Sequence, residues 1–372
     1  MDVLTSAEFR ADSSSRHGVT DCREALADVA WFFVLSRLVL FGAIIVARLG
    51  IPPGPFWEAG GLLNVLGRID GWTDLGSSNP ALEDSRAVLP LFSALVQIAS
   101  TAIRDSPWAA VLLANASLFC AGLLLHRLAQ LESNDRKVPR AAVIFLMFSP
   151  FSVFFAGALA DATYLALALA SFYLAAKRNW IGAVLAAICV SLGNNSGWMI
   201  LAPLLIEFLS ARAAKGSATT TSWLKSPRVW IGVLFAIALV VASILLPAAP
   251  QSAWNTAFAE LMSRSSAFAN YRRFYSDAFS IAVSSAVALF AAGLFLRMRA
   301  SYIVYAGLLI VAFICHADSE LVPSMLMAAF PLCLAAAVFP ARIPLLYDPL
   351  IACSMTLLIL CVILVAGGYW PV

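Results

Sequence analysis

The chain has 372 residues, 62% of them hydrophobic and 12% charged, with a mean hydropathy of +0.88 and a formal net charge of +3. This composition excludes a soluble globular protein and is typical of a membrane protein. The positive charge is small and dispersed, with no basic run interleaved with aromatics, so nucleic-acid binding is excluded as well. Apolar runs of about 17 to 20 residues predict an all-α, polytopic transmembrane helical bundle, because each helical span satisfies its own backbone hydrogen bonds.

The N-terminal segment predicts a tail followed by a permanent anchor. The first 28 residues mix acidic and basic side chains and lack the apolar centre of a cleavable signal peptide. We therefore expect residues 1–29 to be a cytoplasmic tail and residues 30–372 to form one transmembrane domain. Disulfides are not expected, because the seven cysteines show no CxxC pair and mostly lie in apolar runs.

About eleven apolar windows predict the membrane crossings, with boundaries accurate to about 2 to 4 residues. An internal N-terminus then places most of the 24 basic residues on the cytoplasmic side, counting Arg37 with the tail, as the positive-inside rule favours. The C-terminus falls on the extracytoplasmic side. The windows are 30–47, 108–125, 141–157, 162–176, 180–192, 197–210, 229–247, 278–296, 301–315, 321–339 and 349–366.

The run 87–103 is nearly long enough to cross the bilayer, but a crossing there would invert every later loop and place the basic clusters outside. We therefore expect a helix that lies along the membrane surface, within a large first external loop at 48–107. A second external loop is predicted at 248–277. Because the polar residues of the external side gather in these two loops, we expect the chemistry to occur there.

Four regions of the chain carry a resemblance to a known family. They are RIDGW at 68–72 followed by AVLPLFSAL at 87–95, SPFSVFFAGALADATY at 149–164, LGNNSGWMILAPLLIEFL at 192–209, and PSMLMAAFPLCLA at 323–335. In this order they resemble the motifs of the PIG-V-like (GPI mannosyltransferase II-like) family of GT-C membrane glycosyltransferases. The resemblance implies a GT-C-like fold and transfer of a sugar, mannose in that family, from a polyprenyl-phosphate carrier.

Four positions depart from the family's pattern. Ile69 stands where the family has a Trp, and Asp161 where it has an external Glu. Asn194 replaces one family arginine, and Ser324 with Met325 replaces an Arg-Tyr pair. If those arginines hold the donor's phosphate, as the guanidinium fork suits, this chain uses other cations or binds something else. The available external cations are Arg68, Arg86, Arg272 and Arg273.

Asp70 is the candidate catalytic base. Sugar transfer from a lipid phosphate needs a carboxylate that takes the proton of the acceptor hydroxyl while the phosphate leaves from the opposite face of the sugar, which inverts the anomeric carbon. Gly71 would let the backbone approach a substrate, and Trp72 would stack on a sugar or anchor at the interface. The alternative is that Asp70 caps the surface helix or pairs with Arg68 or Arg86.

Asp161 is the second candidate acid. It lies between two apolar runs, at or just inside the external interface, and intramembrane acids are candidates for function by default. It would supply a second catalytic carboxylate, a metal ligand or a partner for an acceptor hydroxyl. The structural alternative is an N-cap for a helix that starts at Ala162.

Further polar residues are candidates for substrate binding, each with a structural alternative. Asn194 and Asn195 either donate to a sugar or phosphate or form a tight external turn. Arg272 and Arg273 either clamp a phosphate or belong to an interfacial belt on anionic headgroups. We expect Glu207 to reach the cytoplasmic interface or to pair with Arg212. No cofactor and no protein metal site are predicted, with a role for a divalent metal left open.

Three functions remain open. The first is an inverting glycosyltransferase with a polyprenyl-phosphate sugar donor and a lipid or glycan acceptor on the extracytoplasmic face. The second is a transporter of a lipid-linked saccharide, which needs charges deep in facing spans, where this sequence places few. The third is a catalytically silent relative that acts as a partner subunit, which the missing arginines favour. The short chain, without an ER-retention signal, favours a bacterial cytoplasmic membrane.

Overall fold

The computed structural model describes residues 17–50, 52, 90–104, 106–133, 135–157, 160–193, 197–213, 298–315, 330–342, 345 and 347–367. The elements in these ranges are all helices, which confirms the all-α prediction for this part of the chain. In chain order they are α1 (His17–Gly50), α5 (Pro90–Ile103), α6 (Ser106–Glu132), α7 (Lys137–Met147), the 3-10 helix η1 (Pro150–Ala156), α8 (Asp161–Ala176), α9 (Trp180–Gly193), the 3-10 helix η2 (Gly197–Ile200), α10 (Leu201–Ala213), α14 (Ala300–Cys315), α16 (Phe330–Arg342) and α17 (Tyr347–Ala366).

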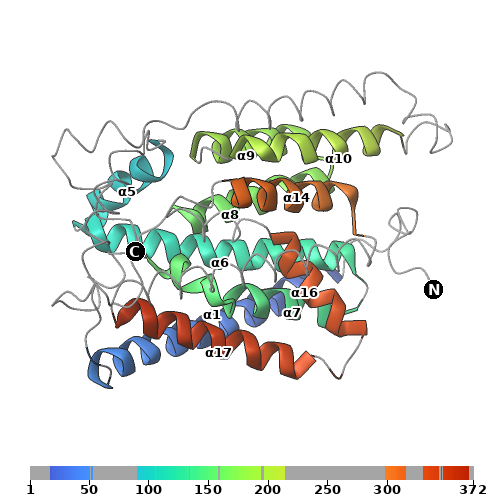
Figure 1. The fold of residues 1–372 in the computed structure, drawn as a ribbon. Helices are drawn as coiled ribbons and strands as arrows, with labels where there is room; N and C mark the ends of the chain where they lie inside the picture. The colour runs from blue at the N-terminus through green and yellow to red at the C-terminus, as the bar shows by residue number, and fades with distance from the viewer. Residues whose placement is uncertain are drawn as a thin grey trace.

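Helix α6 is the central element of the bundle (Figure 1). It packs against α1, α5, α7 and α8, and α17 packs against α1 on one side of the bundle. Ala114, Leu118, Ala121 and Leu125 are fully buried. They recur every three to four residues, which is the spacing that places apolar side chains on one face of a helix. This stripe of small and aliphatic residues lets the neighbouring helices approach α6 closely.

Three helices are long and apolar enough to cross a membrane: Arg23–Gly50, Trp108–Glu132 and Tyr347–Ala366. They match three of the predicted windows, and by length and composition they support the prediction of a membrane protein. Each has at least the roughly 20 residues that a bilayer crossing needs. The remaining predicted crossings are shorter helices or fall outside the described residues, so the total of eleven stays a prediction.

The window 141–157 is not one continuous helix. Helix α7 ends at Met147, and η1 begins at Pro150 after Ser149, whose backbone is extended (φ −62°, ψ 148°). A residue before proline is driven out of the α region by the proline ring, so the break follows from the Ser149-Pro150 pair. The window is therefore two helical segments separated by a break, and its crossing of the membrane stays a prediction.

Helix α5 covers most of the run that we expected to lie on the membrane surface. Its 14 residues reach about 21 Å at 1.5 Å per residue, short of the roughly 30 Å hydrocarbon core. It packs against α6 and α9. The length agrees with a helix that does not cross, and its position along the membrane surface stays a prediction.

Two glycines mark the closest approaches between helices. A Cβ on Gly197 would collide with the Val190 carbonyl group and with the Ser191 Cα of α9. A Cβ on Gly122 in α6 would lie 2.7 Å from the Met147 side chain. The first clash is with backbone atoms, which cannot rotate away, so Gly197 fixes the distance between η2 and α9.

We expect Gly197→Ala to lower the thermal stability of the detergent-solubilised protein, because η2 must move off α9 and such overpacking costs about 1 to 3 kcal/mol. Gly42→Ala is the matched control, since nothing lies within 4 Å of the new methyl group and alanine favours the helix. Melting temperatures followed by tryptophan fluorescence compare the two. Equal melting temperatures would contradict the close packing of η2.

Candidate functional site

Asp161 is the predicted site residue that the structure describes. The others lie outside the described residues, and their roles stay predictions. They are Arg68, Asp70, Gly71, Trp72, Arg86, Asn194, Asn195, Arg272 and Arg273. The candidate site therefore consists of Asp161 and the polar residues that lie at the same position along the bundle axis.

Asp161 is the first residue of α8 and is partly exposed. Ala160 before it already has helical backbone angles (φ −69°, ψ −18°) and holds the N-cap position, so the structural alternative of an N-cap at Asp161 does not hold. A carboxylate in the first turn interacts favourably with the positive end of the helix dipole. This fixes the acid at the start of α8 and leaves its chemical role open.

The start of α8 lies beside the middle of α6. The hydroxyls of Thr163 and Ser117 are 3.0 Å apart and share a hydrogen bond. Ser117 is eleven residues after the first residue of α6, so this contact is about 16 Å along the helix from that end. Asp161, two residues before Thr163, therefore lies near this level of α6, and its depth relative to the membrane interface stays a prediction.

A buried arginine lies at nearly the same level. Arg37 is 7% exposed and stands at the middle of the candidate span Arg23–Gly50. The sequence analysis counted it with the cytoplasmic tail, and that placement was wrong. Its Nη1 donates to Asn115 Oδ1 at 3.1 Å, its Nε to Ser36 Oγ at 3.4 Å, and its guanidinium carbon lies 5.5 Å from the centre of the Phe33 ring.

The side chain of Asn115 joins three elements around this arginine. Its Nδ2 donates to the carbonyl oxygens of Val111 (2.8 Å) and Ala156 (3.3 Å), which leaves Oδ1 to accept from Arg37. Asn115 belongs to α6, Arg37 to α1, and Ala156 is the last residue of η1. Asn115 and Ser117 are about 3 Å apart along the helix axis, so this cluster and the start of α8 occupy one level of the bundle.

We call Arg37, Ser36, Phe33 and Asn115 the Arg37 cluster. An arginine keeps its charge in a protein, and a charge within a membrane span is costly and is therefore a candidate for function. The break between α7 and η1 points the same way, because an interrupted helix at membrane depth is tolerated only inside protein or beside water. Sequence reasoning missed this cluster, although a single arginine inside the apolar window 30–47 was a usable signal.

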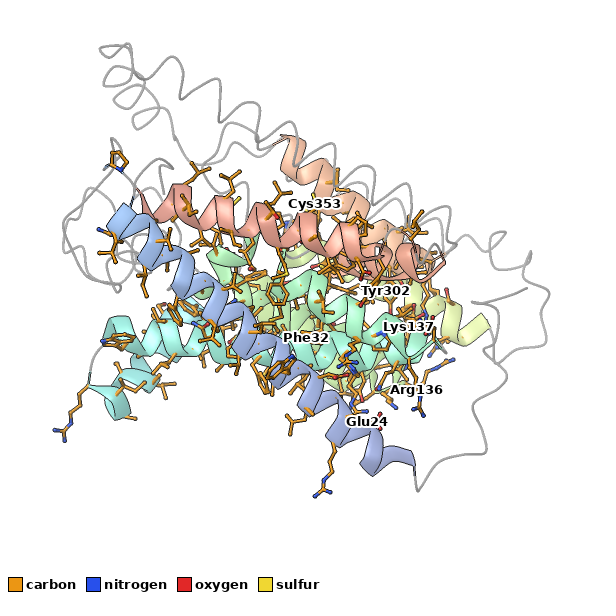
Figure 2. All side chains as sticks on the ribbon, turned by 90° about the horizontal axis from the view of Figure 1, so that it is seen from below. Glu24, Phe32, Arg136, Lys137, Tyr302 and Cys353 are labelled. Carbon is orange, nitrogen blue, oxygen red and sulfur yellow. The ribbon has the colours of Figure 1, made fainter. Side chains whose placement is uncertain are left out.

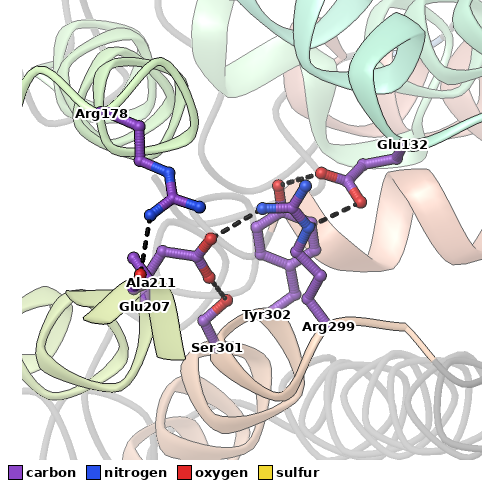
Figure 3. A network of polar contacts seen from close by, with 7 residues as sticks. All are labelled: Glu132, Arg178, Glu207, Ala211, Arg299, Ser301 and Tyr302. Atoms are coloured by element: carbon purple, nitrogen blue, oxygen red, sulfur yellow. Dashed lines mark hydrogen bonds and ion pairs between the residues drawn. The ribbon is translucent and has the colours of Figure 1, made fainter. Parts of the chain in front are cut away.

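A second polar network links α6, α10 and α14 at one end of the bundle (Figure 3). Arg299 donates from Nε to Glu132 at 2.9 Å and from Nη1 to Glu207 at 2.7 Å. Ser301 donates to Glu207 at 2.9 Å and Tyr302 to Glu132 at 3.0 Å. The expected contact of Glu207 with Arg212 was wrong: Arg212 stacks on Phe208 with 4.7 Å between the guanidinium carbon and the ring centre.

The cation of this network is paired within the protein. Burial lowers the pKa of Arg299, but the carboxylates of Glu132 and Glu207 outweigh that effect, and its pKa lies above the ordinary value. With two carboxylates against it, Arg299 needs no external anion, so we interpret the network as a structural clamp. Arg299 and Glu132 are 167 residues apart in the sequence, so no local sequence pattern could have predicted the network.

The same end of the bundle carries other charged residues. Asp28, in the first half of α1, forms an ion pair with Arg140 of α7 at 3.1 Å, and the His126 ring of α6 lies 3.9 Å from the same carboxylate. Glu24, Arg136 and Lys137 lie nearby in Figure 2. The ends of α6 and α10 and the starts of α7 and α14 are thus gathered at this charged end.

Within the described ranges, no group of three or more His, Cys, Asp or Glu side chains could hold a metal ion. Comparisons of the chain with models of known protein families and with curated proteins find no match. The resemblance to the PIG-V-like transferases therefore rests on the four sequence regions quoted above.

Replacing Arg299 with Met should destabilise the protein, because it leaves two partly buried carboxylates facing each other without a cation. Buried pairs cost about 3 to 5 kcal/mol to break in this way, and the partial exposure of these side chains reduces the expected loss to about 2 kcal/mol. Chemical unfolding in detergent measures it. Arg178→Gln is the control, because exposed Arg178 donates only to the Ala211 carbonyl. A loss no larger than the control's would refute the clamp.

Replacing Asn115 with Ala should cost about 1 to 3 kcal/mol, because the Arg37 Nη1 and the Ala156 carbonyl lose a buried partner. Thr356→Ala is the control, since its hydroxyl bonds only to a carbonyl of its own helix and is exposed. Thermal melts of both variants in the same detergent give the comparison. We expect the control to change stability little, and a similarly small effect of Asn115→Ala would show that the amide does not join the three elements.

Proposed function

We propose that the protein is an integral-membrane, inverting glycosyltransferase of the GT-C type. It takes a sugar, mannose by resemblance, from a polyprenyl-phosphate donor and transfers it to a lipid or glycan acceptor on the extracytoplasmic face. The four family-like regions support the proposal, since they occur in family order over most of the chain.

The observation that carries the proposal is the position of Asp161. It follows the break between α7 and α8, where a polar hydroxyl pair and the Arg37 cluster share its level. This break and this acid belong to one of the family-like regions, SPFSVFFAGALADATY at 149–164. A carboxylate at this level of the bundle, after the break between two helices, is a place where a sugar hydroxyl could be bound away from bulk water.

The reaction needs two roles from carboxylates. The bond between the anomeric carbon and the donor phosphate oxygen breaks, and a bond from the acceptor oxygen to that carbon forms on the opposite face. Asp70 takes the proton of the acceptor hydroxyl, and Asp161 assists by holding a hydroxyl of the sugar or acceptor. Cations hold the departing phosphate, with Arg68, Arg86, Arg272 and Arg273 as the external candidates.

The charged end of the bundle supports the orientation. Basic side chains are enriched in short cytoplasmic loops, so we assign the end that holds Arg140, Arg178 and Arg299 to the cytoplasm. The starts of α6 and α8 then face the extracytoplasmic side, where the acceptor is expected. We propose the bacterial cytoplasmic membrane as the location, with the N-terminus inside and the C-terminus outside.

One observation favours a second candidate, a transporter of a lipid-linked saccharide. The sequence analysis disfavoured a transporter because few charged residues were predicted within the membrane spans. Arg37 is such a charge, and η1 supplies broken backbone beside it. The two functions differ in outcome: a transporter moves the sugar-carrying lipid across a bilayer and leaves the sugar attached to it.

Sugar transfer from polyprenyl-phosphate mannose in detergent should fall by about 100-fold or more in Asp70→Asn, because a general base contributes about 10² to 10⁴. A smaller loss is expected for Asp161→Asn. Asp135→Asn is the matched control, since exposed Asp135 caps the first turn of α7 and should leave the rate unchanged.

Equal rates for Asp70→Asn and wild type would remove Asp70 from the mechanism. Activity that copurifies with a second membrane enzyme and survives Asp70→Asn would identify the chain as a silent partner subunit. Movement of the lipid-linked sugar across liposomes, without transfer to an acceptor, would identify a transporter.

A further inference from the structure

The guanidinium of Arg37 has donors that the protein does not use. Of its five N–H groups, one on Nη1 reaches Asn115 and the one on Nε reaches Ser36. Nη2 is buried and has no hydrogen-bond partner. Among the residues that the structure describes, no carboxylate pairs with Arg37, so its charge is surrounded by an amide, a hydroxyl and an aromatic ring.

Neutral partners satisfy donors but do not neutralise a charge. A buried cation is stable when an anion pairs with it, and in the apolar interior of a bundle the cost of leaving it alone is high. The clamp at the charged end shows the usual solution, in which Arg299 contacts two carboxylates. The Arg37 cluster has no such internal anion within the described residues, so an anion from outside the chain would complete it.

The cluster also holds the guanidinium in one orientation. Asn115 is fixed by its bonds to the Val111 and Ala156 carbonyls, and Phe33 packs edge-on against Phe119 with 5.6 Å between ring centres. With these contacts made, Nη2 remains without a partner. A guanidinium with an unused, charged donor group is suited to the oxygens of a phosphate.

We propose that Arg37, oriented by Asn115, binds the phosphate of the polyprenyl-phosphate carrier inside the bundle. The proposal rests on the proposed function for the identity of the carrier. A phosphate attached to a long apolar chain is an anion that can reach a site at the middle of a membrane span. Arg37 would then supply the cation that the family-like segments lack at Asn194 and Ser324, at the same level as Asp161.

Binding is measured without turnover, as the change in melting temperature of the full-length protein when undecaprenyl phosphate is added in detergent. A ligand that binds the folded state raises the melting temperature. We expect a rise for wild type and none for Arg37→Met, with affinity weakened by at least about tenfold, the loss expected for a charge-assisted hydrogen bond. Arg212→Met is the control, because Arg212 stacks on Phe208 at the charged end and should keep the full rise.

Three further ligands identify the source of the phosphate. Undecaprenol has the chain without the charge and should give no rise dependent on Arg37. Phosphatidylglycerol and inorganic phosphate test an ordinary headgroup and a free anion. An equal Arg37-dependent rise with either of them would overturn the assignment to the carrier.

The variants also separate binding from folding. If Arg37 only ties α1 to α6, Arg37→Met will melt lower without ligand and will still respond fully to undecaprenyl phosphate, which overturns the proposal. Should Arg37→Met fail to fold, Arg37→Gln keeps an amide donor for Asn115 and Arg37→Lys keeps the charge. We then expect the lysine variant to retain part of the rise and the glutamine variant to lose it, and equal responses would reject the site.

Failure of this subsite is distinguishable from failure of the transferase. Sugar transfer at the wild-type rate and affinity in Arg37→Met would leave the transferase standing and reject the subsite. Arg37-dependent binding of undecaprenyl phosphate by a protein that transfers no sugar would keep the subsite and reject the transferase.

Discussion

Arg37 places a permanent positive charge at the middle of a membrane-spanning helix, and much of the surrounding structure follows from accommodating it. The charge requires polar neighbours where a lipid-facing helix has none. Asn115 of α6 supplies one: its Oδ1 accepts from Arg37, and its Nδ2 donates to the Ala156 carbonyl at the end of η1. One carbonyl that the break between α7 and α8 leaves outside an α-helix, that of buried Ala156, thus gains a partner.

Buried Arg37 and partly buried Arg299 show two different electrostatic solutions. Arg299 lies between two carboxylates at the charged end, where its network closes on itself and joins three helices. Arg37 has neutral partners and an unused Nη2. A cation that is paired with carboxylates of the protein holds its helices together. A cation without an anionic partner can bind an anionic ligand. The difference in pairing, rather than in residue type, separates the structural arginine from the candidate site.

Local sequence patterns predicted the positions of helices, because helix formation depends mainly on interactions between residues close in sequence. Apolar periodicity gave the helices, and α8, α9 and α17 begin or end within a few residues of the expected bounds. The Ser149-Pro150 pair was present in the sequence, but the apolar run around it was read as one span. Contacts between Arg37 and Asn115, 78 residues apart, and between Arg299 and Glu132 depend on which helix faces reach each other. No spacing in the sequence encodes that choice.

A fixed cation beside the phosphate would act differently in the two functions. In a transferase the donor is a phosphodiester with one negative charge, and the carrier that leaves is a phosphomonoester with nearly two at neutral pH. Charge therefore grows on the oxygens nearest Arg37 as the sugar departs, and an interaction that strengthens toward the transition state accelerates the reaction. In a transporter the phosphate charge is constant, so the same arginine contributes only to affinity. A fixed guanidinium that has no anionic partner in the described part of the protein would thus contribute more to a transferase than to a transporter.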